Sequence, residues 1–340
     1  MKKMTKIGYD IIGDVHGCAK ELKELLHRLG YQCDDAGVYR HSERTVVFIG
    51  DLVDRGEGQL EVLEIAKAMV DAGTAQMVMG NHEFNAVCYK IKGSDGKYIR
   101  EHSDHNEDEH KKFLALTDEQ QQYYLDWFRT LPLWLEIEAP NGNKLRLIHA
   151  CWHPESMKVV EEVCGADKLT TDEHYMEARR KGSRLYWAVE TLLKGPEISL
   201  TKHGHAPYRD FIGKIRTDAR ARWWDRDAAT LRDIADVRGV RQEHSDEPYP
   251  PLPPDPVEHF DFSLIYTDPV PVIYGHYWFQ WDNHREDWTE HTACVDFSAV
   301  KGGKLVAYRW NGEPTITWEN YEPHDPDIVA PTPSDRRGDR

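Results

Sequence analysis

The sequence lacks any long apolar run, and its six cysteines are scattered without a Cys-x-x-Cys spacing. A membrane-spanning helix needs about 20 consecutive apolar residues, so we expect no membrane span. The scattered cysteines argue against a zinc ribbon or a disulfide framework, and we expect reduced thiols. The N-terminus carries lysines but no apolar segment behind them, as a secretory signal would require. We therefore expect a cytoplasmic protein.

Positive charge is also scarce, because 43 lysines and arginines stand against 59 aspartates and glutamates, a formal net charge of −16. This balance argues against general nucleic-acid binding and against adhesion to an anionic membrane. It does not exclude a phosphorylated substrate, because a bound divalent cation would reverse the local field. The 340 residues, 40% of them hydrophobic, can form one large domain or two smaller ones.

The N-terminal third shows strands that alternate with helices. Apolar runs at 7–12, 46–49 and 75–79 each end at a glycine, which is typical of buried parallel strands. Between them, apolar side chains recur at helical spacing over 22–29 and again over 60–70. This order predicts an α/β fold with a parallel sheet and right-handed crossovers.

Two segments interrupt the regular pattern. Residues 92–112 are strongly polar, and we expect an exposed loop there. Residues 200–256 are irregular, charged and rich in proline, and we expect a lid or connector beside the site. We predict a single catalytic domain over 1–322 and a disordered tail over 323–340, which has little apolar content.

The second half of the chain predicts a hairpin, helices and closing strands. Residues 133–138 and 144–148 flank Asn141-Gly142, a strong hairpin signal. A helical pattern follows over 155–195. Short apolar segments then predict the closing strands, at 270–274, 295–297, 304–310 and 315–318.

Polar side chains stand at the predicted tips of five strands. They are three imidazoles, two carboxylates and one amide, from His16, His149, His276, Asp14, Asp51 and Asn81. Mixed nitrogen and oxygen ligands suit manganese, iron or zinc. Six ligands are too many for one tetrahedral ion and suit two ions that share a carboxylate. Two such ions can clamp a phosphoryl group and supply hydroxide near neutral pH.

Structural alternatives exist for single members of this set. An isolated Asp-x-His is more often a structural or capping feature, and His149 could be a core histidine. His203-Gly204-His205 also contains a Gly-His pair, but an apolar strand leads only into Gly275, which favours His276. The acidic and histidine-rich run 101–112 could bind metal, although a solvated loop is favoured.

Three motifs occur in a fixed order: GDVHG at 13–17, GDLVDRG at 50–56 and GNHE at 80–83. With the later His149 and Gly275-His276, they resemble the calcineurin-like metallophosphoesterases. More narrowly, the chain is similar to the phosphoprotein-phosphatase branch, which includes Ser/Thr phosphatases and symmetrical diadenosine tetraphosphate hydrolases. This resemblance implies a β-sandwich flanked by helices (α/β/β/α), with a metal site at the C-terminal strand tips.

The resemblance also implies a role for each residue. Asp14, His16 and Asp51 would hold the first metal, and Asp51 would bridge to a second ion held by Asn81, His149 and His276. His82 would be the general acid, oriented by Asp54, and Arg55 would bind the phosphate. Histidine suits the acid role because it can release a proton near pH 7. Manganese is the favoured metal, with iron, zinc or nickel as alternatives.

One departure narrows the resemblance. Many of these enzymes end in Gly-His-x-His, whereas Gly275-His276-Tyr277-Trp278 lacks the second histidine. The protein-phosphatase and tetraphosphatase branches share this lack, and they add a second phosphate-binding arginine. Of the candidates Arg216, Arg220 and Arg222, we select Arg222.

The substrate predicted from the sequence is a phosphomonoester on a small molecule, nucleotide or protein, hydrolysed with two bound divalent ions. The alternative is symmetrical cleavage of diadenosine tetraphosphate or a related dinucleoside polyphosphate. A third interpretation is an inactive binding protein that keeps the fold. Such a protein would be expected to have lost a ligand or His82, and all are present.

Overall fold

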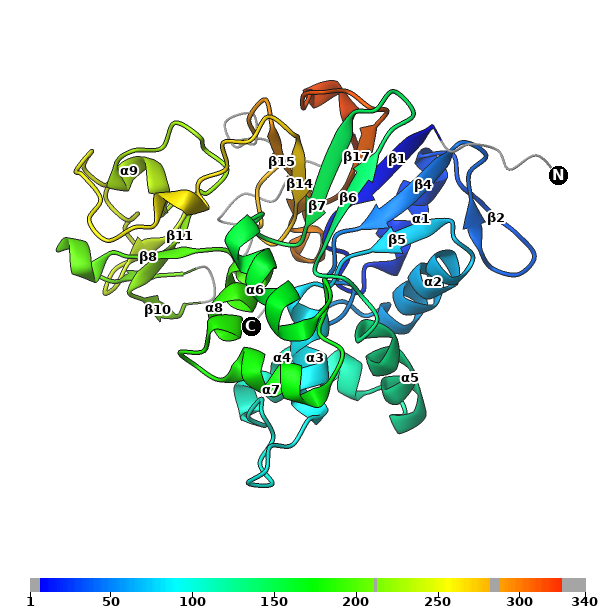
Figure 1. The fold of residues 1–340 in the computed structure, drawn as a ribbon, viewed down its shortest axis with the longest axis horizontal. Helices are drawn as coiled ribbons and strands as arrows, with labels where there is room; N and C mark the ends of the chain where they lie inside the picture. Colours follow the sequence, from blue (N-terminus) through cyan, green and yellow to red (C-terminus); the bar gives the residue numbers. More distant parts are fainter. Residues whose placement is uncertain (1–6, 211–212, 282–287, 326–340) are drawn as a thin grey trace.

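The structure is a computed structural model that describes residues 7–210, 213–281 and 288–325. Figure 1 shows two β-sheets beside each other, helices next to them, and a smaller lobe at one end of the molecule. One hydrophobic core draws residues from both sheets, such as Phe48 and Ile273. The predicted α/β fold, with two sheets and flanking helices, is confirmed.

The larger sheet has six strands, which are β1 (Gly8–Ile12), β4 (Arg44–Phe48), β5 (Ala75–Met77), β16 (Asp296–Phe297), β17 (Lys304–Trp310) and β18 (Tyr321–Pro323). Strands β1, β4 and β5 are parallel neighbours, as the N-terminal pattern predicted. Strand β17 runs antiparallel to β1 on the other side of the sheet, and β16 and β18 pair with β17 in turn. The carboxyl ends of the three parallel strands therefore meet at one edge.

The smaller sheet has four strands, in the order β15 (Thr292–Cys294), β14 (Val272–Tyr274), β7 (Lys144–Ile148) and β6 (Trp134–Glu138). The predicted hairpin is confirmed, because β6 and β7 pair antiparallel around a glycine with positive φ, Gly142. Strands β7, β14 and β15 are parallel. The ends of β7 and β14 lie side by side, since the N–H of Gly275 donates to the carbonyl of His149 at 2.9 Å.

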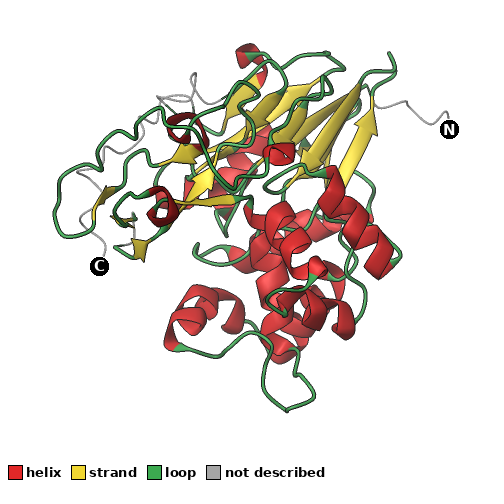
Figure 2. Ribbon diagram, turned by 60° about the vertical axis from the view of Figure 1, so that its left-hand side comes forward, coloured by secondary structure: helices red, strands yellow, loops and turns green. Residues whose placement is uncertain are grey.

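The principal helices are α1 (Ala19–Arg28), α2 (Gln59–Asp71), α3 (Asn81–Lys90), α4 (Asp104–Leu114), α5 (Asp118–Phe128), α6 (Pro154–Cys164), α7 (Asp172–Arg179) and α8 (Arg184–Lys194). Figure 2 shows many of these helices gathered at one end of the strands. Helices α1 and α2 lie between the parallel strands in sequence, as predicted, and α6 to α8 fill the predicted helical region. None of the helices in the described ranges combines the length and apolar character that a membrane span requires.

Two local expectations differ from the structure. The polar run 92–112, expected as a loop, contains most of α4, which buries His110 and Phe113 on one face. A short helix can be largely polar when only one narrow face is covered. The strand expected at 315–318 is wrong: the segment lacks strand pairing, and the N–H of Thr317 donates to the hydroxyl of Tyr308 at 2.9 Å.

The smaller lobe comes mainly from 200–256, the segment expected to be an irregular lid or connector, together with the strand directly before it. It contains β8 (Glu197–Ser199), β11 (Asp218–Ala221), β12 (Ala235–Asp236) and α9 (Leu231–Ile234). These elements surround a small separate core. The single domain over 1–322 stays a prediction, and 326–340 of the predicted tail lie outside the described residues.

Candidate metal centre

The residues expected as metal ligands are all buried. Five of them lie on loops that follow strands β1, β4, β7 and β14, and Asn81, after β5, is the first residue of α3. Several have a positive φ, which non-glycine residues seldom adopt: His16 has 42°, Asp51 has 53° and His276 has 70°. Each such residue costs about 1–3 kcal/mol unless the surroundings hold it. Strain is therefore concentrated at this edge of the molecule.

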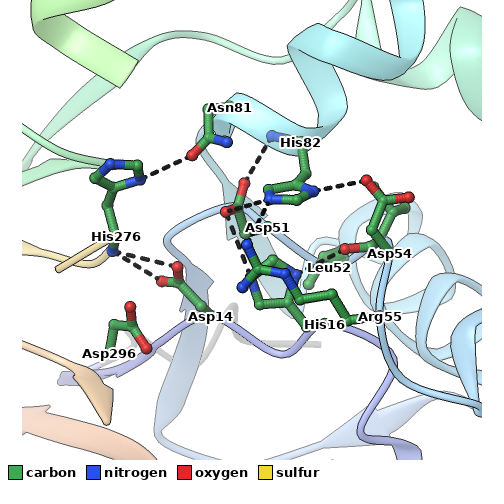
Figure 3. A network of polar contacts seen from close by, with 12 residues as sticks. Asp14, His16, Asp51, Leu52, Asp54, Arg55, Asn81, His82, His276 and Asp296 are labelled. Atoms are coloured by element: carbon green, nitrogen blue, oxygen red, sulfur yellow. Dashed lines mark hydrogen bonds and ion pairs between the residues drawn. The ribbon is translucent and has the colours of Figure 1, made fainter. Parts of the chain in front are cut away.

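Asp51 occupies the centre of the cluster. Its Oδ2 lies 3.5 Å from Nε2 of His149, 3.6 Å from Nε2 of His16 and 3.9 Å from Nε2 of His82. Figure 3 shows His276 and Asn81 on one side of Asp51, and His82 and Arg55 on the other. Burial raises the pKa of Asp51, but the neighbouring imidazoles His149 and His82 outweigh it and hold that pKa well below its usual range. Asp51 is therefore a carboxylate.

Asn81, the first residue of α3, completes one half of the cluster. Its Oδ1 lies 2.9 Å from Nε2 of His149 and 2.8 Å from Nδ1 of His276. Two groups of ligand atoms each lie within 4.8 Å of one another, namely His16–Asp51–His82 and Asp51–His149–His276. Because Asp51 belongs to both groups, this donor set could hold divalent cations on either side of one carboxylate.

Asp14 lies at the border of the cluster rather than within either group. Its carboxylate oxygens lie 3.2 and 3.3 Å from the N–H of His276. Burial raises the pKa of Asp14 well above its usual range, and the nearby carboxylate of Asp296 adds to this. A bound cation would oppose this shift, so the electrostatics of this part of the cluster also fit a metal.

His82 is almost completely buried, and its two ring nitrogens face different partners. Nδ1 lies 2.6 Å from Oδ2 of Asp54, and Nε2 faces the cluster. Burial lowers the pKa of His82, but the carboxylates of Asp51 and Asp54 together outweigh this and raise it overall. Burial raises the pKa of Asp54, yet the adjacent imidazoles of His110 and His82 lower it to about 2. His82 can therefore carry a proton toward the cluster.

Arg55 extends across the cluster from the loop after β4. Its Nη1 lies 3.1 Å from Nε2 of His16, and its Nη2 lies 3.1 Å from Nε2 of His82. The guanidinium carbon lies 4.3 Å from the centroid of the Trp278 ring. This stacking holds the planar fork of Arg55 where a phosphate could accept two hydrogen bonds.

The structure does not bring Arg222 to this cluster. Its Nε donates to the carbonyl of Asp233 at 2.6 Å and its Nη2 to that of Arg232 at 3.1 Å, both within the smaller lobe. Arg220 instead donates to the carbonyl of His276 at 3.2 Å and lies over Tyr277. The role of Arg222 therefore stays a prediction, and Arg220 is the candidate that contacts a residue of the cluster.

Two acidic residues, Glu83 and Glu109, contact the site although the sequence did not predict a role for them. Glu83 is buried, and its carboxylate accepts hydrogen bonds from the N–H groups of Asp51 at 2.8 Å, Leu52 at 2.8 Å and Gly80 at 3.1 Å. These bonds hold the Asp51 loop in its strained conformation. Helix α4 also brings Glu109 to the site, with Oε1 3.9 Å from Nε2 of His82. The contact between Glu109 and His82 can be recognised only in the structure, because Glu109 lies in a uniformly polar stretch of the sequence.

Comparisons with known proteins agree with this geometry. A family model described as calcineurin-like phosphoesterase matches residues 9–277. Proteins named bis(5'-nucleosyl)-tetraphosphatase PrpE [asymmetrical] are similar to parts of the chain. The protein of Oceanobacillus iheyensis is 35% identical over 137 residues, or 39% of this chain and 52% of that protein. The protein of Halalkalibacterium halodurans is 51% identical over 75 residues, or 22% of this chain and 30% of that protein.

The chain thus spans about half the length of the first of these curated relatives, and less of the second. Among solved structures, the cold-active protein-tyrosine phosphatase of a psychrophilic Shewanella species aligns with 94% of this chain and 81% of that chain. The TM-score is 0.40, and 16% of the aligned residues are identical.

Proposed function

The chain belongs to the calcineurin-like phosphoesterase family, and from this premise we propose that it is a two-metal phosphatase that hydrolyses phosphomonoesters, phosphoproteins included. The family assignment makes it a hydrolase of phosphoric esters, which argues against the inactive binding protein. One observation supports the proposal most. A buried pair of His82 and Asp54 lies beside a phosphate-binding candidate, Arg55, at the edge of the cluster around Asp51.

We propose that Asp51 is shared between two metal positions. Asp14 and His16 would complete one position, and Asn81, His149 and His276 would complete the other. Divalent cations bound at such a site acidify water and offset the charge of the phosphoryl oxygens. Manganese remains the favoured metal, with iron, zinc and nickel as alternatives, and the cytoplasm remains the expected compartment.

The protein's own side chains would then bind the substrate and move one proton. Arg55 would bind two phosphoryl oxygens with its planar fork. Arg220, which lies against His276, would supply the second guanidinium. His82 would donate its Nε2 proton to the leaving oxygen, while Asp54 holds the proton on Nδ1 and keeps Nε2 directed at the substrate.

Glu109 favours monoesters over dinucleotides. Its Oε1 lies 3.9 Å from Nε2 of His82, the atom that would protonate the leaving oxygen. Burial raises the pKa of Glu109, but the charges of His82 and Arg100 outweigh it and lower that pKa overall. Glu109 is therefore anionic at neutral pH. A nucleotide leaving group would bring further negative charge toward this carboxylate, whereas a serine, threonine or tyrosine oxygen would not.

Hydrolysis of dinucleoside polyphosphates is the second candidate function. The names of the curated relatives favour it, although they specify asymmetrical cleavage and the alternative predicted from the sequence was symmetrical. The similarity to the first relative covers 39% of this chain.

A direct comparison of substrates tests the proposal. With manganese present, kcat/KM is measured on p-nitrophenyl phosphate, a phosphotyrosine peptide and diadenosine tetraphosphate, with Asp51→Asn as the inactive control. We expect the two monoesters to be hydrolysed faster. A higher kcat/KM on the dinucleotide would reverse our order, and the nucleotides released would distinguish symmetrical from asymmetrical cleavage.

A further inference from the structure

Helix α4 places a buried histidine, His110, against the partner of the proposed proton donor. The side chain of His110 is 1% exposed, and its Nδ1 lies 2.8 Å from Oδ2 of Asp54. The same oxygen lies 2.6 Å from Nδ1 of His82. One oxygen atom of Asp54 therefore contacts two imidazoles.

This shared oxygen orients the ring of His82. Nδ1 of His82 donates to Oδ2 of Asp54, whereas Nδ1 of His110 lies 2.8 Å from the same oxygen as a close polar contact without the alignment of a hydrogen bond. His82 then directs Nε2 toward the cluster, as a proton donor to substrate requires. Within the described residues, Oδ1 of Asp54 has no hydrogen-bond partner. The rings of His82 and His110 therefore hold the side chain of Asp54 in place. Without His110, only His82 would hold it.

The ring of His110 is itself held in place. It packs edge-on against Tyr89, with 5.5 Å between ring centroids and 71° between planes. Tyr89 stacks on His102 at 3.7 Å, and His102 stacks on Tyr98 at 3.8 Å. Ser103 caps the start of α4, where its side chain accepts a hydrogen bond from the N–H of Asn106. The helix and the stacked rings thus deliver the His110 nitrogen in one orientation.

We propose that His110 is a positioning residue: it fixes the carboxylate of Asp54, which in turn fixes the tautomer and orientation of His82. The inference rests on the proposed function, because it requires His82 to protonate the leaving group. His110 itself would not touch substrate. Its loss should therefore matter only when the leaving oxygen needs a proton.

Two substrates that differ in the leaving group test this role. Nitrophenolate leaves readily without protonation, whereas the phenolate of phenyl phosphate depends more on a general acid. General acid catalysis contributes about 10²–10⁴-fold in typical enzymes, and imperfect orientation would forfeit part of that. For His110→Phe, which keeps a ring against Tyr89 but removes the polar contact with Asp54, we expect kcat on phenyl phosphate to fall about tenfold or more. On p-nitrophenyl phosphate we expect a fall of less than about threefold.

Two amide variants distinguish the loss of the polar contact with Asp54 from a change in side-chain volume. His110→Asn carries an N–H near the place of Nδ1, and we expect it to restore most of the lost rate on phenyl phosphate. His110→Gln carries its N–H near the place of Nε2, away from Asp54, and should restore little. His105→Asn, at an exposed position on the same helix, is the matched control and should leave both rates unchanged.

The outcomes are distinguishable. Equal losses on both substrates in a folded His110→Phe protein, or equal rates for the Asn and Gln variants, would overturn the positioning role and leave the proposed phosphatase intact. If the wild-type protein with bound metal hydrolyses neither ester, the proposed function fails, and this inference fails with it.

Discussion

Replacing Glu109 with glutamine is the most informative single change for the choice of substrate. Glu109→Gln removes one negative charge and keeps the size of the side chain. The leaving oxygen must come within about 3 Å of Nε2 of His82 to receive a proton. Because Oε1 of Glu109 lies 3.9 Å from that nitrogen, a leaving-group charge would lie within about 7 Å of Glu109.

The size of the effect follows from Coulomb's law. Two like charges about 7 Å apart repel by about 2 kcal/mol at an effective dielectric constant of about 20. The side chain of Glu109 is 27% exposed, and its other oxygen pairs with Arg100. Both facts reduce the repulsion, and we take about 1.4 kcal/mol, which corresponds to about tenfold in rate.

The assay compares kcat/KM on diadenosine tetraphosphate with kcat/KM on a phosphotyrosine peptide. For Glu109→Gln we expect this ratio to rise about tenfold. Asp108→Asn is the matched control: Asp108 is an exposed neighbour paired with Lys111 at 2.8 Å, and its removal should leave the ratio unchanged. An unchanged ratio in Glu109→Gln, or an equal rise in both variants, would refute the proposal that Glu109 lies next to the leaving group.

Three further predictions concern the arginines, the clamp on the Asp51 loop and acid stability. Arg220→Ala should lower kcat/KM on p-nitrophenyl phosphate about tenfold or more, the cost of a charge-assisted hydrogen bond, whereas Arg222→Ala should leave it within about twofold. Equal losses would contradict the proposed role of Arg220. Glu83→Ala removes the acceptor of four buried N–H groups, and we expect chemical denaturation to show a loss of at least about 3 kcal/mol in the free energy of unfolding. A loss below about 1 kcal/mol would show that these hydrogen bonds are dispensable. The pKa of Asp54 is lowered to about 2, so its contribution to stability is present above its unfolded pKa of about 4 and is lost as the pH falls through 2. The difference in free energy of unfolding between wild type and Asp54→Asn, measured in urea, should therefore shrink by about 2 kcal/mol from pH 5 to pH 2. A constant difference would contradict the ion pairing of Asp54.

The parallel strands could be predicted because their signals are local. Apolar runs that end in glycine identify β1 and β4, and the leucine spacing identifies α1. The same local signals place polar residues at strand tips, where a parallel sheet brings them together. The convergence of Asp51, His149 and His276 follows from this topology.

Other features of the site could not be predicted, because they depend on contacts between segments that lie far apart in the sequence. Helix α4 is polar on most of its surface, and only the burial of one face against Asp54 and Tyr89 shows why His110 lies there. The choice between Arg220 and Arg222 depends on the contacts that each side chain makes. Such details are set by packing between segments distant in sequence, and periodicity carries no information about them.

The metal content of the purified protein tests the central claim most directly. Elemental analysis after dialysis against manganese should give two equivalents per chain for the wild type. Asp51→Asn, which weakens the carboxylate shared by both groups, should retain fewer than one, while Asp71→Asn, an exposed carboxylate on α2, should retain two. Two equivalents in Asp51→Asn, or none in the wild type, would contradict the account.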